Sequence, residues 1–249
     1  MRVTLFVPCL VESALPEIGE ATARVLARAG VTVEYAEGLT CCGQPLYKTG
    51  HFDETRRLAR QVVAGLEPAT HVVAPSGSCV NMIRHYPELF EAEPAWRDRA
   101  QALADRVFEL SEFLVRVLGV SDLGAEFSGN AAYHDSCQVG QALGLTEPPR
   151  TLLGNVRGLT VHELARPLAC CGFGGMFSVQ YPEISEAVAE EKIADILATG
   201  AEYVVTAEVS CLLHLRRHLE AAGSAVTALH LAEVLARVPG RTSTGGGAS

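Results

Sequence analysis

The chain has 249 residues, 48% of them hydrophobic, and a formal net charge of −9 at pH 7. This length and hydrophobic content suffice for one large domain or two of ordinary size with a buried core. The acidic balance argues against a nucleic-acid partner, because phosphate binding requires a basic face, and no apolar run approaches the roughly 20 residues that span a bilayer.

Strands and helices alternate along the first half of the chain. Short apolar and β-branched runs predict three strands, at residues 3–7, 31–35 and 71–74. Apolar residues at helical spacing predict three helices, over residues 13–29, 52–66 and 94–118. Gly30 ends the first of these helices, as a C-terminal glycine commonly does.

The second half repeats this alternation. It opens with a predicted strand that leads from Ala131 into Cys137, and further strands are predicted at residues 159–164 and 203–206. Helices are predicted over residues 150–155, 182–198 and 212–222. Residues 239–249, rich in Gly, Ser and Thr, are predicted to form a disordered end.

Such alternation favours parallel strands joined by right-handed crossovers. The predicted fold is therefore α/β, with two homologous halves that each form a small parallel sheet flanked by helices. The first half is predicted to cover residues 1–122 and the second residues 130–238. Because the short apolar N-terminus lacks a signal-peptide cleavage site, we expect a cytoplasmic protein whose cysteines stay reduced.

Eight cysteines form two sets of four in the same order, and these sets carry the candidate site. Each set has a lone cysteine, an adjacent pair followed by glycine, and a second lone cysteine. The sets are Cys9, Cys41, Cys42 and Cys79, then Cys137, Cys170, Cys171 and Cys211. The first gap spans 31 residues in one set and 32 in the other. Matching segments in a fixed order indicate a duplicated unit.

The predicted topology brings the cysteines of each set to one edge of a sheet. Each lone cysteine follows a predicted strand and each Cys-Cys-Gly lies on the loop after another, and sites in open parallel sheets form at the carboxyl ends of the strands. Helix N-termini there favour the thiolate that binds metal. Four glycines are expected to let the backbone approach a bulky cofactor, namely Gly43, Gly172, Gly174 and Gly175.

Iron–sulfur clusters are the cofactor that these cysteines favour. Adjacent cysteines fit poorly into one tetrahedral zinc site, whose ligand pairs usually have about two to four residues between them. They suit the neighbouring irons of a cluster, which cysteine thiolates hold. Zinc, redox-active thiols and buried structural cysteines are the alternatives. Zinc that only joins the two halves would make the chain a non-enzymatic structural module.

His134 and Asp135 are the candidates for catalytic acid–base chemistry, because they stand just before Cys137 and the pKa of histidine lies near neutrality. The alternative, which we favour, is a histidine that hydrogen-bonds at the end of a strand. Structural or surface roles are expected of the other candidates, His162, His230, Arg157 and Arg166. No Gly-x-Gly-x-x-Gly motif predicts a dinucleotide site, so we expect the substrate chemistry to lie partly on another protein.

The arrangement Cys…Cys-Cys-Gly…Cys, present twice, resembles the cysteine-rich (CCG) domain family. This family includes a heterodisulfide reductase subunit and the iron–sulfur subunit of glycolate oxidase, and the chain is more similar to its lactate-utilisation members. The similarity extends over about residues 1–238. It rests on residues 41–45, 76–79, 155–159, 170–175 and 210–213.

The resemblance implies an oxidoreductase subunit that transfers electrons in a complex oxidising L-lactate, a small 2-hydroxy acid, to pyruvate without NAD. It implies companion lactate-utilisation proteins, at least one of them an iron–sulfur protein. It also implies iron–sulfur clusters, with [4Fe-4S] preferred, held by the eight cysteines. A disulfide-reducing subunit and a glycolate oxidase subunit are the alternatives within the family.

Two positions depart from the family pattern. In some members each repeat ends in Cys-x-x-Cys, whereas Ser76 and Glu208 occupy the first of these cysteine positions here. Each half therefore lacks a fifth thiolate, which argues against the noncubane cluster that those members hold. Four thiolates suffice for a conventional cluster, and an oxygen of Glu208 is an alternative ligand.

Overall fold

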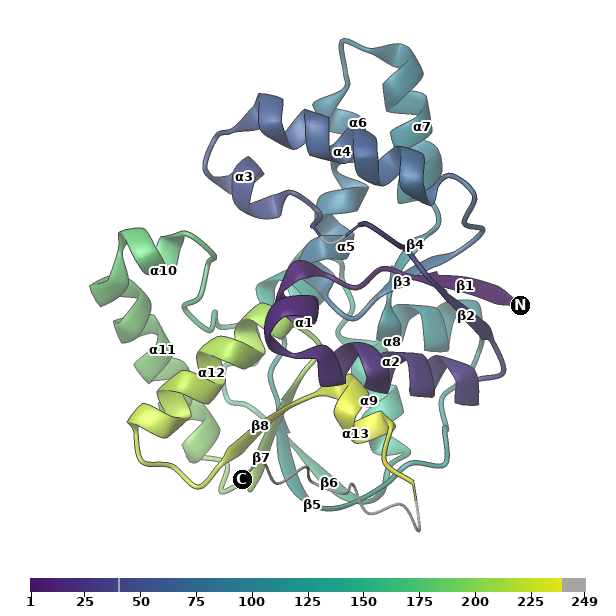
Figure 1. The fold of residues 1–249 in the computed structure, drawn as a ribbon. Helices are drawn as coiled ribbons and strands as arrows, with labels where there is room; N and C mark the ends of the chain where they lie inside the picture. The colour runs from purple at the N-terminus through teal and green to yellow at the C-terminus, as the bar shows by residue number, and fades with distance from the viewer. Residues whose placement is uncertain (40, 239–249) are drawn as a thin grey trace, which may run out of the picture.

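A computed structural model describes residues 1–39 and 41–238. The predicted disordered end, residues 239–249, lies outside the described residues. Two four-stranded sheets form the molecule, with strand orders β2-β1-β3-β4 and β6-β5-β7-β8, and every pair of neighbours is parallel (Figure 1). The α/β fold with two similar halves is therefore confirmed.

Each sheet contains the three predicted strands and one more. The first sheet consists of β1 (Arg2–Leu5), β2 (Thr32–Tyr35), β3 (Val72–Ala74) and β4 (Val107–Glu109). The second consists of β5 (Glu126–Tyr133), β6 (Arg157–Glu163), β7 (Tyr203–Thr206) and β8 (Thr227–His230). The fourth strand of each sheet, β4 and β8, is an edge strand that the sequence pattern did not predict.

Helices connect the strands on both sides of each sheet. In the first half they are α1 (Cys9–Ala14), α2 (Pro16–Arg28), α3 (Gln44–Lys48), α4 (Phe52–Leu66), α5 (Gly77–Arg84), α6 (Tyr86–Leu89), α7 (Pro94–Ala104), α8 (Leu110–Glu112) and the π-helix η1 (Phe113–Val117). In the second half they are the π-helix η2 (Cys137–Ala142), α9 (Glu147–Gly154), α10 (Phe177–Gln180), α11 (Pro182–Leu197), α12 (Val209–Ala221) and α13 (Leu231–Leu235).

The prediction of one helix over residues 94–118 is wrong. The helix α7 ends at Ala104, and residues 107–109 pair with β3 as β4. Val107 and Leu110 are both fully buried, as a helical stripe requires, so the apolar spacing does not distinguish the two structures. Pairing with β3 decides the outcome, because it satisfies backbone groups that would otherwise lie unpaired at the sheet edge.

The predicted helix over residues 13–29 is divided. It forms α1 and α2, which meet at Leu15. Pro16 causes the division, since proline has no backbone N–H to continue a helix but is tolerated in the first turn of a new one. Gly30 follows the end of α2 with a φ of 82°, as its predicted C-terminal position requires.

The two halves share their apolar core. One buried cluster joins Val3 and Leu5 of β1 to Ala131 and Tyr133 of β5. Another joins Ile18 of α2 to residues of α12, and Figure 1 shows α1 and α2 lying against the helices of the second half. The carboxyl ends of both sheets are thereby fixed relative to each other. None of the helices in the described ranges has the length and apolar character that a bilayer crossing requires.

Candidate metal centre

The cysteines lie at the carboxyl ends of the strands, as predicted. Cys9 begins α1 after β1, and Cys137 begins η2 after β5. Cys79 and Cys211 lie in the first turns of α5 and α12, which follow β3 and β7. The adjacent pairs lie on the loops that follow β2 and β6. The three strands that lead into each set of cysteines therefore end at one edge of their sheet.

In the first set, the sulfurs of Cys42 and Cys79 lie 3.3 Å apart and both residues are buried. The backbone N–H of Gly43 donates to the sulfur of Cys41 over 3.4 Å. A hydrogen bond from Cys9 is the main cause that lowers the pKa of the Cys41 thiol, and the N–H of Gly43 lowers this pKa further.

The second set repeats these contacts. The sulfurs of Cys171 and Cys211 lie 3.0 Å apart, and the N–H of Gly172 donates to the sulfur of Cys170 over 3.3 Å. Hydrogen bonds from Cys137 and then from Cys171 lower the pKa of the Cys170 thiol. Each half thus has one cysteine with a lowered thiol pKa beside a buried pair of sulfurs.

Both sets line the same cavity, which has a volume of about 310 Å³. Its walls include sulfur-bearing residues of both halves, namely Cys9, Cys42, Cys79, Cys137, Cys170, Cys171 and Cys211. Gly174 and Gly175, from the loop before α10, also line it, and Lys48 of α3 contributes a positive charge. The two sets are therefore neighbours across one space.

All eight cysteines are free thiols. The closest pairs, at 3.0 and 3.3 Å, are well beyond the roughly 2.05 Å of a disulfide bond. Clustered thiols with backbone N–H donors to sulfur are the donor set that soft metals and iron–sulfur clusters take. The residues present therefore fit the binding of a metal or a cluster.

The glycines have two different roles in the structure. Gly43 and Gly172 have φ values of 81° and 94°, and both donate to a neighbouring sulfur. A Cβ added to Gly172 would lie 2.5 Å from the carbonyl oxygen of Ser185, so this glycine allows close packing on α11. Gly174 and Gly175 instead form part of the cavity wall, where the expected approach to a cofactor remains a prediction.

Ser76 and Glu208 meet each other across the two halves. Glu208 is 1% exposed, and one of its oxygens accepts from the Ser76 hydroxyl over 3.2 Å. The carboxylate also accepts from the N–H of Ser78 over 2.7 Å and from the hydroxyls of Ser78 and Ser210, each over 2.9 Å. Glu208 therefore holds the residues directly before Cys79 and Cys211, and its oxygens are already engaged in hydrogen bonds.

His134 is fully buried directly after β5, and burial lowers its pKa to about 3. Neither ring nitrogen has a hydrogen-bond partner among the described residues. The favoured expectation of a histidine hydrogen-bonded through its ring is therefore wrong. One ring nitrogen and the sulfurs of Cys171 and Cys211 lie within 4.8 Å of one another.

Asp135 has a structural partner. Its two oxygens accept from the Arg150 guanidinium over 2.9 and 2.6 Å, and Asp135 is 1% exposed. A charge held in a buried bidentate pair is poorly suited to accept a proton from a substrate. This geometry argues against an acid–base role for Asp135.

The remaining candidates have the structural or surface roles expected of them. The buried ring of His230 accepts from the N–H of Ala232 and caps α13. Arg157 pairs with Glu126 over 2.6 Å, and Arg166 pairs with Glu191 over 2.9 Å. His162 lies half-buried on β6.

An amide network at the cavity wall escaped the sequence reasoning. Gln44 donates to the carbonyl oxygen of Ser78 over 3.1 Å and to the side-chain oxygen of Gln138 over 3.3 Å. Asn81 donates to the same oxygen of Gln138 over 3.0 Å. Gln44 and Gln138 each stand close to a cysteine in sequence, and only this proximity could have indicated that they belong to the site. The network links the two halves beside their cysteines.

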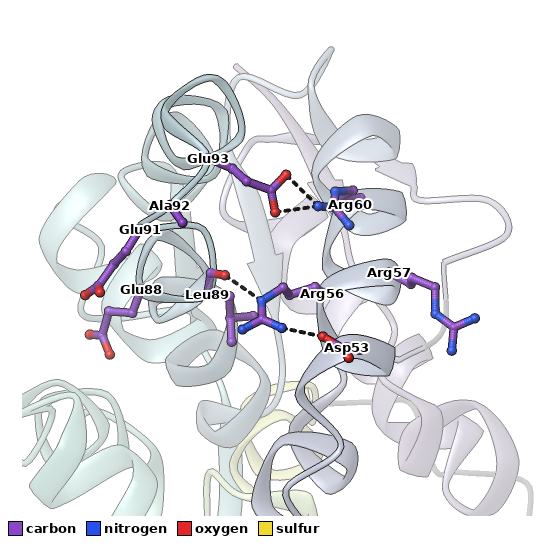
Figure 2. A pocket seen from close by; sticks show the side chains of 9 residues that line it. All are labelled: Asp53, Arg56, Arg57, Arg60, Glu88, Leu89, Glu91, Ala92 and Glu93. Atoms are coloured by element: carbon purple, nitrogen blue, oxygen red, sulfur yellow. Dashed lines mark hydrogen bonds and ion pairs between the residues drawn. The ribbon is translucent and has the colours of Figure 1, made fainter.

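A second hollow, of about 510 Å³, lies between α4 and the segment around α6 (Figure 2). Its arginines are paired with nearby acceptors. Arg56 donates to Asp53 over 2.6 Å and to the carbonyl oxygen of Leu89, and Arg60 donates to both oxygens of Glu93 over 2.6 Å. The contacts with Leu89 and Glu93 tie α4 to its neighbours, and three arginines against four carboxylates leave the hollow without net positive charge.

Comparison with known proteins agrees with this arrangement. The profile of the CCG family, described as a cysteine-rich domain, matches residues 3–84 and 131–216. The chain is 44% identical to lactate utilization protein A of Bacillus cytotoxicus and to lactate utilization protein A 1 of Bacillus cereus. Each alignment of 235 residues covers 94% of this chain and 98% of the relative.

A solved structure shows the same fold. A hypothetical protein from Helicobacter pylori superposes with a TM-score of 0.68 over 97% of this chain, at 11% sequence identity. The matched region is 49% of that protein, so the chain spans about half of its length. The two matched cysteine-rich segments and the full-length similarity lead to one conclusion: the chain belongs to the cysteine-rich (CCG) domain family and, within it, to the lactate utilization protein A family.

Proposed function

We propose that this chain is the iron–sulfur electron-transfer subunit of a multi-protein complex that oxidises L-lactate to pyruvate. The observation that carries the proposal is the pair of matching cysteine sets on one cavity. Each set contains a close pair of buried sulfurs and a third cysteine sulfur that accepts a backbone hydrogen bond. The full-length relatives are named for lactate utilisation, which supports the choice of substrate.

Cysteines of this chain would hold one cluster per half, at Cys9, Cys41, Cys42 and Cys79 and at Cys137, Cys170, Cys171 and Cys211. A bound cluster supplies one-electron transfer. The N–H groups of Gly43 and Gly172 stabilise negative charge on sulfur, and burial of the close pairs keeps water from them. Companion proteins, at least one of them an iron–sulfur protein, would exchange electrons with this chain.

Cys42→Ala and Cys171→Ala test the proposal. Each removes one buried sulfur from one set, so each variant should lose the iron of that half and abolish growth on lactate in a strain that depends on this protein. Growth on another carbon source and the circular dichroism of the purified variants serve as controls for folding. Normal lactate-dependent growth of both variants would contradict the proposal.

A thiol–disulfide function is the second candidate, because the close sulfur pairs would need little movement to form disulfides. Each disulfide formed would release two electrons and two protons to a disulfide substrate, which would be reduced to two thiols. Reduction of a small disulfide by metal-free protein would favour this candidate. Zinc without visible absorption would favour a structural module instead.

A further inference from the structure

The two halves differ at the residue that directly follows the central strands β1 and β5. Phe6 and His134 each stand three residues before the first cysteine of their set. The N–H of Phe6 donates to the carbonyl oxygen of Val73 on β3, and the N–H of His134 donates to that of Val205 on β7, both over 2.9 Å. The two residues therefore occupy equivalent places at the ends of equivalent central strands.

Phe6 shows what this place in the fold requires. It is fully buried and packs in one apolar cluster with Cys42 and Cys79. An apolar ring thus occupies this place in the first half, within the buried cluster that contains the close pair of sulfurs. Nothing in the fold itself demands a polar side chain there, so the polarity of His134 needs a separate explanation.

His134 lacks the partners that a buried imidazole normally has. Buried polar groups are almost always hydrogen-bonded, because an unpaired one costs stability. Both ring nitrogens of His134 lack a hydrogen-bond partner among the described residues, although the ring is fully buried. An unpaired nitrogen in a fully buried ring indicates a binding partner that is not part of the polypeptide.

The sulfurs of Cys171 and Cys211 supply the setting for that partner. One ring nitrogen lies with these two sulfurs in a group whose atoms are all within 4.8 Å of one another. A metal stands about 2.0–2.3 Å from nitrogen and sulfur ligands, so these atoms have nearly the spacing of one coordination shell. Neutral imidazole is also a common metal ligand.

We propose that His134 ligates the metal group held by Cys171 and Cys211, so that the second half binds its metal through nitrogen and sulfur and the first half through sulfur alone. This inference rests on the proposed function, because it concerns the cluster of the second half. His134 would add a neutral nitrogen ligand to the four thiolates of the second half, so the two halves would hold groups with different ligand sets.

Isotope labelling with pulsed EPR tests the ligand directly. Protein labelled with ¹⁵N-histidine and purified anaerobically is reduced, and the nitrogen coupling to the cluster signal is compared with that of unlabelled protein. The coupling should change with the isotope in the wild type and disappear in His134→Phe, the residue that the first half already accommodates. His214→Gln is the matched control, since His214 is also buried with an unpaired ring nitrogen, and it should keep the coupling.

A cluster signal with no histidine coupling would overturn the inference and leave the proposed function intact. Protein that forms no cluster would overturn the proposed function, and cobalt binding to the metal-free chain then tests His134. In that case His134→Phe should weaken Co²⁺ binding about tenfold or more and remove one nitrogen ligand from the visible spectrum. Unchanged cobalt affinity and spectrum, relative to the wild type and His214→Gln, would overturn the inference.

Discussion

Glu208 shows how one residue can position cysteines of both halves. Its carboxylate, 1% exposed, accepts hydrogen bonds from Ser76 and Ser78 of one half and from Ser210 of its own. Ser78 and Ser210 directly precede Cys79 and Cys211. The spacing of the Cys79 and Cys211 sulfurs therefore depends on a carboxylate that the family resemblance presents only as a substitute for cysteine.

Glu208→Gln should lower both stability and metal content. The amide keeps one acceptor oxygen but loses the charge and places an NH₂ group against donors, which should cost about 2 kcal/mol of unfolding free energy. Urea unfolding measures this change, and iron per chain measures the effect on the site. Glu202→Gln, at an exposed carboxylate that accepts from the N–H of Asn130, should change stability by less than about 1 kcal/mol. Equal effects of the two substitutions would contradict the positioning role.

At the scale of single residues, the sequence pattern predicts the cysteines of the candidate site. It does not predict the residues that surround their sulfurs. Eight cysteines in two ordered sets were sufficient to place the sulfurs together at the strand ends. The partners of Glu208 and the unpaired ring of His134 depend on contacts between segments distant in the chain. Ser78 and Glu208 are separated by 130 residues, and no local pattern encodes such a pair.

At the scale of elements, the start of α8 contains an unusual buried acid. Glu109 is fully buried, and one of its oxygens accepts from the N–H groups of Ser111 and Glu112 in a capping box. Its other oxygen has no hydrogen-bond partner among the described residues. Burial is the main cause that raises the pKa of Glu109 from 4.5 to about 7.

The stability of the protein should therefore fall as the pH rises through 7. Because the folded state binds the proton of Glu109 more tightly than the unfolded state, its stabilising effect is complete below pH 4.5 and is lost above the folded pKa. Glu109→Gln should remove up to about 3 kcal/mol of this pH dependence, since glutamine keeps a capping oxygen and cannot ionise. Denaturant unfolding between pH 5 and 8 checks this, with the exposed Glu91→Gln as a control. Parallel curves for wild type and Glu109→Gln would refute the assignment.

The sequence pattern predicted the bounds of two elements correctly. The helix α4 has the predicted bounds, Phe52–Leu66, and β7 those of Tyr203–Thr206. The edge strands β4 and β8 were missed, although β3 and β7 are equally short and were predicted. Their structure depends on pairing with β3 and β7, which a local pattern does not report.

The whole molecule is held together by contacts that cross between its halves. The Arg28 guanidinium at the end of α2 donates to the carbonyl oxygens of Leu123, Leu235 and Ala236 over 3.2, 3.0 and 2.9 Å. The shared apolar cluster joins β1 to β5. The duplication was evident in the sequence, but the repeat pattern does not reveal which helices of one half pack on the other.

Arg28→Ala should lower the unfolding free energy by about 2 kcal/mol, because it leaves three carbonyl oxygens without a charged donor. Unfolding should remain a single transition, since the halves share one core. Arg24→Ala on the same helix removes only an exposed ion pair with Glu20 and should cost less than about 0.5 kcal/mol. Two separate transitions would show that the halves unfold as independent units. Equal losses of unfolding free energy for the two variants would show that the Arg28 contacts do not stabilise the protein.

Iron and acid-labile sulfide per chain, measured on anaerobically purified protein with the EPR spectrum of the same sample, test the central claim most directly. Two cysteine sets on one cavity predict iron and sulfide in nearly equal amounts, with a signal that appears on reduction. Zinc without sulfide, or a metal-free protein with intact thiols after anaerobic handling, would contradict the account of this chain as an iron–sulfur electron carrier.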